Sequence, residues 1–170
     1  KEHLFKALDG QTEIGEIQPS DKKKWINVIN GGEAEGELIG GNLTLICSSL
    51  GTPYEIDAKD KILFIEEVDT EPWVFDHMMC HLFNAGVLHT ALGFVIGECA
   101  RCVPRRLDPG FHSDISLEDI LEFYLKPLGK PALHGLPIGH TKDLATLPMG
   151  VKAYINADDK KFVIEEIAVL

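Results

Sequence analysis

The sequence lacks any long apolar run, and this absence restricts the classes of protein that it can encode. No stretch approaches the roughly 20 consecutive apolar residues that a helix needs to cross a bilayer. The first residues, from Lys1 to Phe5, do not form the apolar region of a signal peptide. We therefore predict a cytoplasmic location and no association with a membrane.

Positive charge is also scarce. The 170 residues include 16 Lys and Arg but 27 Asp and Glu, which gives a formal net charge of −11. Nucleic acids are bound through Lys and Arg side chains that displace counterions from the phosphates, and anionic lipid surfaces attract basic segments in the same way. The composition therefore argues against both kinds of partner.

Cysteine is sparse, with four residues in a chain that is 45% hydrophobic and can build a core without disulfides. We expect these thiols to be free, in a reducing compartment. Cys99 and Cys102 form a single Cys-x-x-Cys pair, which is half of a zinc site or a redox pair. Because the sequence contains no second pair, neither use is favoured.

What the sequence does contain is an alternation of strand and helix patterns within the length of one domain. We expect residues 1–24 to be the end of a helix followed by an interdomain linker, and residues 25–170 to be the domain itself. Alternating strands and helices, closed by two strands, predict an α/β domain with a mixed sheet flanked by helices. The apolar segments of strand type are 25–29, 37–39, 62–65, 92–96, 131–133, 151–155 and 162–167, and the helical patterns are 43–50, 72–87 and 116–125.

Two side chains are candidates for chemistry. Glu66 directly follows the buried strand predicted at 62–65, and functional side chains collect at the carboxyl ends of strands in α/β sheets. A carboxylate in that position needs a partner to offset its desolvation, unless it simply faces water. His140 follows Gly139 in a constrained loop and can transfer protons near neutral pH, although it is one of seven histidines.

Other candidates are weaker. His77 and His81 have the spacing of two metal ligands on one helix face, with Cys80 between them, but the Glu of the zinc-protease pattern is missing. The polar face of an amphipathic helix explains the same residues. Ser48 and Ser49 lack the Gly-x-Ser-x-Gly turn of a nucleophile, so the sequence predicts no nucleophile and no metal site in this chain.

Five segments together resemble the LD-carboxypeptidases, a serine peptidase family that includes muramoyltetrapeptide carboxypeptidases and microcin-immunity peptidases. The similarity extends from residue 33 to the end of the chain, and the run GLPIGHT at 135–141 is more similar to the murein-recycling branch. The five segments, in order, are 36–43 (GELIGGNL), 51–54 (GTPY), 62–68 (ILFIEEV), 93–98 (GFVIGE) and 139–151 (GHTKDLATLPMGV).

The resemblance implies a swivelling β/β/α domain that forms the C-terminal half of a two-domain cytoplasmic hydrolase. It implies Glu66 as the acid and His140 as the base of a Ser-His-Glu triad, whose serine and oxyanion hole belong to an N-terminal domain that is absent here. The reaction would remove the terminal D-Ala from a murein tetrapeptide without a cofactor. We then expect the isolated chain to fold but not to hydrolyse, to expose an apolar docking patch for the missing domain, and to be capable of forming a homodimer.

The sequence departs from the family pattern at His77, where an arginine is common, and at Glu67, where an aspartate is common. Three alternatives remain open. One is a microcin-immunity type of peptidase that cleaves a peptide-nucleotide or a related amide. The others are a non-catalytic binding module and a metal-dependent hydrolase that uses His77, Cys80 and His81.

Overall fold

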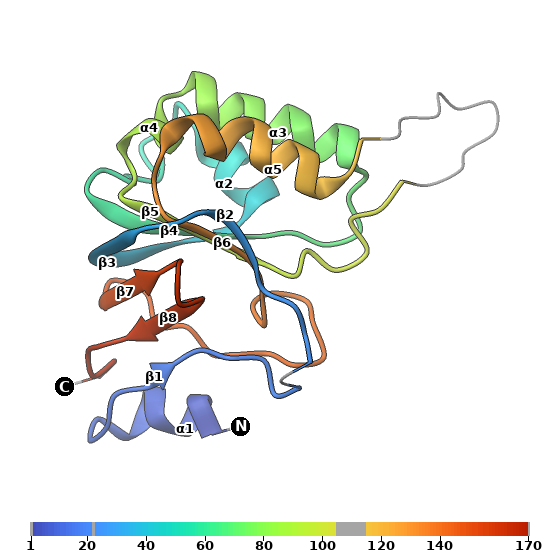
Figure 1. Ribbon diagram of the computed structural model, residues 1–170. Coiled ribbons are helices and arrows are strands. Elements are labelled where there is room, and N and C mark those ends of the chain that lie inside the picture. Colours follow the sequence, from blue (N-terminus) through green and yellow to red (C-terminus); the bar gives the residue numbers. More distant parts are fainter. Residues whose placement is uncertain (1, 22, 105–114, 170) are drawn as a thin grey trace.

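Four parallel strands form the centre of the fold. The computed structural model describes residues 2–21, 23–104 and 115–169, and its sheet has the strand order β1-β8-β7-β3-β4-β5-β6-β2 (Figure 1). The strands are β1 (Gly15–Glu16), β2 (Asn27–Asn30), β3 (Glu33–Asn42), β4 (Lys61–Glu66), β5 (Gly93–Gly97), β6 (Ala132–Leu136), β7 (Lys152–Asn156) and β8 (Lys161–Ile164). The helices are α1 (Glu2–Asp9), α2 (Leu43–Ser49), α3 (Pro72–Asn84), α4 (Val87–Thr90), α5 (Leu117–Leu125) and the 3₁₀ turn η1 (Lys126–Leu128).

The sheet is mixed, as the sequence predicted. Strands β3, β4, β5 and β6 are parallel neighbours, and β2 pairs with β6 in the antiparallel sense. On the other side, β7 pairs with β3, β8 with β7 and β1 with β8, all antiparallel. The helical connections between the parallel strands account for this arrangement, because parallel neighbours need a crossover whereas the closing strands are joined by a short turn.

Both faces of the central strands are covered. Along β4, Leu63 and Ile65 belong to the apolar cluster beneath the helices, whereas Ile62 and Phe64 belong to a second cluster with residues of β7 and β8. Figure 1 shows the helix layer on one side of the central strands and β7, β8, β1 and α1 on the other. A strand buried on both faces has a continuous apolar sequence, and the run at 62–65 therefore predicts β4.

The helices end where the sequence provides the physical signals. Pro72 opens α3, where its missing N–H costs nothing, and Phe75, Met79 and Leu82 of this helix are fully buried. The helix predicted at 72–87 is divided, because Gly86 adopts a left-handed conformation (φ +83°) and a new short helix, α4, begins. A complete capping box between Ser116 and Asp119 opens α5.

The N-terminal stretch packs on the domain. Ile14 and Ile17 are buried, and β1 between them pairs with β8. The Ser20 hydroxyl donates a hydrogen bond to a carboxylate oxygen of Asp143 at 2.6 Å. The polar segment that we expected as a linker therefore contributes an edge strand. This strand is only two residues long, too short to produce a strand pattern in the sequence. Among the residues described, no helix has the length and apolar character to span a bilayer.

Candidate active site

The candidate site lies at one edge of the sheet. The four parallel strands end at Asn42, Glu66, Gly97 and Leu136. Because parallel strands have their carboxyl ends at the same edge, the segments that follow them come together there. These segments are the start of α2, the loop to α3, the Cys99–Cys102 turn and the loop that carries His140.

Glu66 and His140 are in direct contact. The Nδ1 atom of His140 lies 2.9 Å from Oε2 of Glu66, although the two residues are 74 positions apart in the sequence. The Glu66 side chain is 9% exposed, whereas that of His140 is 57% exposed. The carboxylate is therefore buried behind an imidazole ring that faces the solvent, and the partner that the sequence required for Glu66 is His140.

Two glycines permit this contact. A Cβ atom on Gly139, which has φ +92°, would lie 2.4 Å from Oε2 of Glu66. A Cβ atom on Gly97 would lie 2.5 Å from the carbonyl oxygen of Ile138 in the loop before the histidine. Side chains at these positions would push the loop away from the carboxylate. Sequence reasoning identified the histidine but missed this role of the glycines, for which the Gly-His pair was the available signal.

Glu67 has a separate, structural set of contacts. Its Oε2 accepts hydrogen bonds from the backbone N–H and the hydroxyl of Thr44 at 2.9 and 2.7 Å, and its Oε1 accepts from the Asn42 amide and the Val68 N–H at 3.1 and 2.9 Å. Burial alone would raise the pKa of Glu67, but these hydrogen bonds outweigh it and lower the pKa below its ordinary value. Glu67 thus fastens the end of β4 to the first turn of α2.

The Glu66–His140 arrangement suits proton transfer. A carboxylate that accepts the Nδ1–H of a histidine fixes the ring tautomer and leaves the Nε2 lone pair as a base. The serines considered in the sequence are engaged elsewhere, since the hydroxyls of Ser48 and Ser49 donate to the carbonyl oxygens of Thr44 and Ile46 at 2.7 and 2.8 Å. The arrangement can therefore take up and return a proton.

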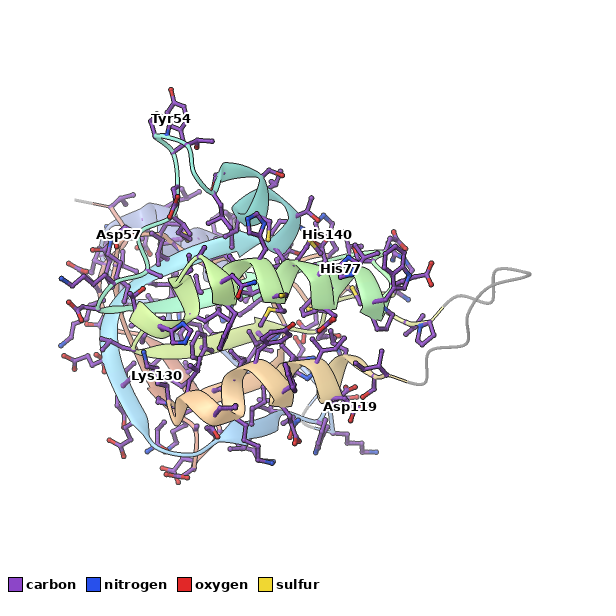
Figure 2. The ribbon with its side chains drawn as sticks, turned by 90° about the horizontal axis from the view of Figure 1, so that it is seen from above. Tyr54, Asp57, His77, Asp119, Lys130 and His140 are labelled. Carbon is purple, nitrogen blue, oxygen red and sulfur yellow. The ribbon has the colours of Figure 1, made fainter. Side chains whose placement is uncertain are left out.

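The weaker metal-site candidates lie on the helix layer. His77 and His81 are exposed on α3, and Figure 2 looks onto the helix layer that carries His77. The His77 ring packs edge-on against Trp73, with ring centroids 5.5 Å apart. Within residues 2–21, 23–104 and 115–169, no three His, Cys, Asp or Glu side chains gather in a way that could hold a metal ion. The loop after α2, part of the family segment at 51–54, carries Tyr54 outward from the body (Figure 2).

Comparison with known proteins identifies the family. Residues 35–155 match the model of the LD-carboxypeptidase C-terminal domain. The chain is 45% identical over 134 residues to a probable murein peptide carboxypeptidase of Bacillus subtilis, a match that covers 79% of this chain and 41% of that protein. The chain belongs to the LD-carboxypeptidase family and corresponds to its C-terminal domain.

Other relatives and solved structures agree in fold. The microcin C7 self-immunity protein MccF of Escherichia coli is 30% identical over 139 residues, covering 79% of this chain and 38% of MccF. A structure of MccF in complex with glutamyl sulfamoyl guanosine superposes with a TM-score of 0.75 at 25% identity, over 87% of this chain and 43% of that one. The muramoyltetrapeptide carboxypeptidase of Oxalobacter formigenes gives a TM-score of 0.68 at 30% identity, over 84% and 49%. The chain thus spans less than half the length of these relatives.

Proposed function

We propose that this chain is the acid–base half of a serine LD-carboxypeptidase that removes the terminal D-Ala from murein tetrapeptides during cytoplasmic peptidoglycan recycling. The observation that carries the proposal is the 2.9 Å contact between Nδ1 of His140 and Oε2 of Glu66 at the carboxyl edge of the sheet. Family membership supports the peptidase class, and the similarity to the Bacillus subtilis protein supports a murein peptide as the substrate.

The proposed chemistry follows from the orientation of the ring. His140 accepts the serine proton through Nε2 as the hydroxyl attacks the scissile carbonyl, and then returns that proton to the leaving amine of D-Ala. Glu66 holds the ring tautomer and stabilises the imidazolium that forms. In this mechanism the serine and the oxyanion hole take the place of a metal-bound water, so the reaction needs no cofactor.

We further propose that the serine belongs to an N-terminal domain of the same protein, with residues 1–24 between that domain and residues 25–170. The relatives support this, because the match to this chain covers only 38–49% of their lengths. Leu4, Phe5 and Leu8 of α1 are 45%, 68% and 65% exposed and provide apolar surface for such a contact. The same surface would allow two isolated chains to pair.

Release of D-Ala from a purified murein tetrapeptide tests the function. A longer protein that includes the proposed serine domain should release D-Ala, and His140→Ala should lower kcat by about 10⁶-fold, the order seen when the base of a triad is removed. The isolated 170-residue chain should fold, as circular dichroism would show, but release no D-Ala. Turnover by the isolated chain that disappears with His140→Ala would contradict the division of the triad between two domains.

A microcin-immunity activity is the second candidate. The similarity to MccF, whose structure was determined with glutamyl sulfamoyl guanosine, favours it. Both activities would use the same Glu66–His140 pair, so only the substrate distinguishes them. We expect the longer protein to have a higher kcat/KM for the tetrapeptide than for an aminoacyl sulfamoyl nucleoside, and the reverse ranking would favour the immunity activity.

A further inference from the structure

A tight turn leads from Cys99 to Cys102. This turn directly follows β5 at the same edge as the candidate active site, and the Cys102 N–H donates to the Cys99 carbonyl oxygen at 3.1 Å. Such a turn holds the first and fourth Cα atoms within about 7 Å, and a disulfide requires about 4.4–6.8 Å. The turn therefore holds the two Cα atoms at about the separation that a disulfide requires.

The two thiols interact with each other and with the loop that follows Glu66. A thiol–thiol hydrogen bond lowers the pKa of Cys102 and, together with burial, raises that of Cys99. The backbone N–H of Glu67 lowers the pKa of Cys99, and the backbone N–H of Thr70 lowers that of Cys102, so both thiols lie near the loop that follows Glu66. Cys102 is thus the thiol that ionises first, and Cys99 is the neighbour positioned to react with it.

Backbone strain is concentrated in this part of the molecule. Five non-glycine residues in the described ranges have positive φ angles, and three of them, Asp69, Cys99 and Arg101, lie here. The Arg101 guanidinium donates to both carboxylate oxygens of Asp69 at 2.6 Å, and the Asp69 N–H donates to the Ala100 carbonyl at 3.0 Å. These contacts clamp the loops after β4 and β5 together. Strain of this kind collects at functional sites, and proton transfer by His140 does not use it.

We propose that Cys99 and Cys102 form a reversible disulfide when the protein meets a hydroperoxide. The Cys102 thiolate attacks one peroxide oxygen, the O–O bond breaks, and the second oxygen leaves as hydroxide and is protonated to water. Cys99 loses its proton and attacks the resulting sulfenic acid, which forms the S–S bond and releases a second water. Two thiols and one hydrogen peroxide thus yield one disulfide and two waters, and a dithiol reductant reverses the reaction.

Burial selects a small oxidant. Cys99 and Cys102 are each 4% exposed, so a bulky aromatic disulfide has little access to either sulfur, and we propose hydrogen peroxide, which is nearly the size of water, as the oxidant. The other two cysteines differ in setting, since both are only half-buried. Burial and the charge of Glu67 raise the pKa of Cys47 to about 11, so this thiol stays protonated at neutral pH.

Mass spectrometry of the 170-residue chain tests the proposal. In a Cys47→Ser/Cys80→Ser background, hydrogen peroxide should remove two hydrogen atoms and both alkylatable thiols, and dithiothreitol should restore them. An aromatic disulfide should label the folded chain at least about ten-fold more slowly than the urea-unfolded chain. Additional Cys102→Ser should abolish the loss of hydrogen, and additional Cys99→Ser should leave a sulfenic acid on Cys102 that dimedone traps.

Two results would overturn the proposal. One is that both thiols stay free in the folded background chain under conditions that fully oxidise glutathione in the same solution. The other is that oxygen atoms are added to the cysteines without a cross-link. Circular dichroism before treatment verifies that each variant is folded. The measurement involves no peptidase activity, so its failure leaves the proposed carboxypeptidase function unaffected, and failure of that function leaves the disulfide standing.

Discussion

At the scale of single residues, the approach of the His140 loop to Glu66 depends on the absence of a side chain at Gly139. The Cα of Gly139 is so close to the carboxylate that any Cβ would overlap it. Its positive φ of +92° is a second reason why glycine is required there. The contact between His140 and Glu66 therefore depends on the absence of a Cβ atom at Gly139 as well as on the two side chains themselves.

Gly139→Ala should displace the imidazole from Glu66. We expect the loop to move by about 1 Å and the activity of the longer protein to fall by about 10²-fold, as misplaced catalytic groups typically cause. The ¹⁵N chemical shifts of the His140 ring in the isolated chain report loss of the Nδ1 hydrogen bond. Gly129→Ala is the matched control, because Gly129 also has a positive φ (+63°) but its added Cβ meets nothing within 4 Å. Equal ring shifts in the two variants would refute the steric explanation.

At the scale of secondary structure elements, Glu67 accepts four hydrogen bonds, and three of them, from Asn42 and Thr44, connect the end of β4 to the start of α2. Glu67→Gln should lower the free energy of unfolding by about 1–3 kcal/mol at neutral pH, because the NH₂ group of glutamine cannot accept the hydrogen bonds that one buried carboxylate oxygen of Glu67 accepts. The pKa of Glu67 is lowered in the folded state, so its stabilisation is complete above the unfolded value of about 4.3 and is lost as the pH falls through the lower folded value.

Urea unfolding at a series of pH values measures this effect. The difference in stability between the wild type and Glu67→Gln should shrink as the pH falls below about 4. The exposed control Glu122→Gln should change stability by no more than about 0.5 kcal/mol at any of these pH values. A difference for Glu67→Gln that stays constant with pH would show that the charge of Glu67 makes no contribution.

A histidine of β6 also makes stability fall with falling pH, but because its charged form is disfavoured in the folded state. His134 is buried, and neither of its ring nitrogens has a hydrogen-bond partner among the described residues. Burial lowers the pKa of His134, against a weaker opposing effect of the Glu118 charge. The unfolded chain therefore binds a proton on this residue before the folded chain does, and stability decreases as the pH falls through the unfolded value of about 6.5.

His134→Leu should remove this dependence. Between about pH 7 and pH 5, the free energy of unfolding of the wild type should fall more steeply than that of the variant, and at the lower pH the variant should be the more stable of the two. The exposed residue His81 provides the control, since His81→Leu should follow the wild-type slope. If the free energies of unfolding of the wild type and of His134→Leu change in parallel with pH, the buried His134 imidazole is not kept neutral in the folded state.

Much of this element order could be predicted from the sequence, for identifiable reasons. The apolar run before Glu66 indicated a strand buried on both faces, and Ser116 with Asp119 indicated the start of α5. The first half of β3 was missed because its exposed Glu33 and Glu35 carry no apolar signal.

The candidate site could be predicted less directly. The position of Glu66 at a strand end is a local feature of the sequence, but its contact with His140 spans 74 residues and no local pattern encodes it. That pairing was expected only from the family resemblance. The contacts of Glu67 with Asn42 and Thr44 were not predicted at all, because the register of two neighbouring strands decides which side chains meet at their ends.

At the scale of the whole molecule, the candidate functional residues lie at one edge of the sheet, whereas the two apolar clusters cover its faces. The helix layer and the second apolar cluster stabilise the two faces of the sheet, and the four carboxyl-end segments are free to carry function. In the proposed function, Glu66 and His140 supply the acid and the base of a hydrolase, and the nucleophile is a serine of another domain. The His140 side chain is 57% exposed, which leaves room for the second domain that we propose to present this serine.

The most direct test of this account is a double-mutant cycle on D-Ala release by the longer protein. We predict that Glu66→Gln reduces kcat by about 10⁴-fold and His140→Ala by about 10⁶-fold, and that the double variant loses little more than His140→Ala alone, because the carboxylate acts only through the ring. Independent, multiplying losses, or full activity in Glu66→Gln, would contradict the claim that these two side chains work as one acid–base unit.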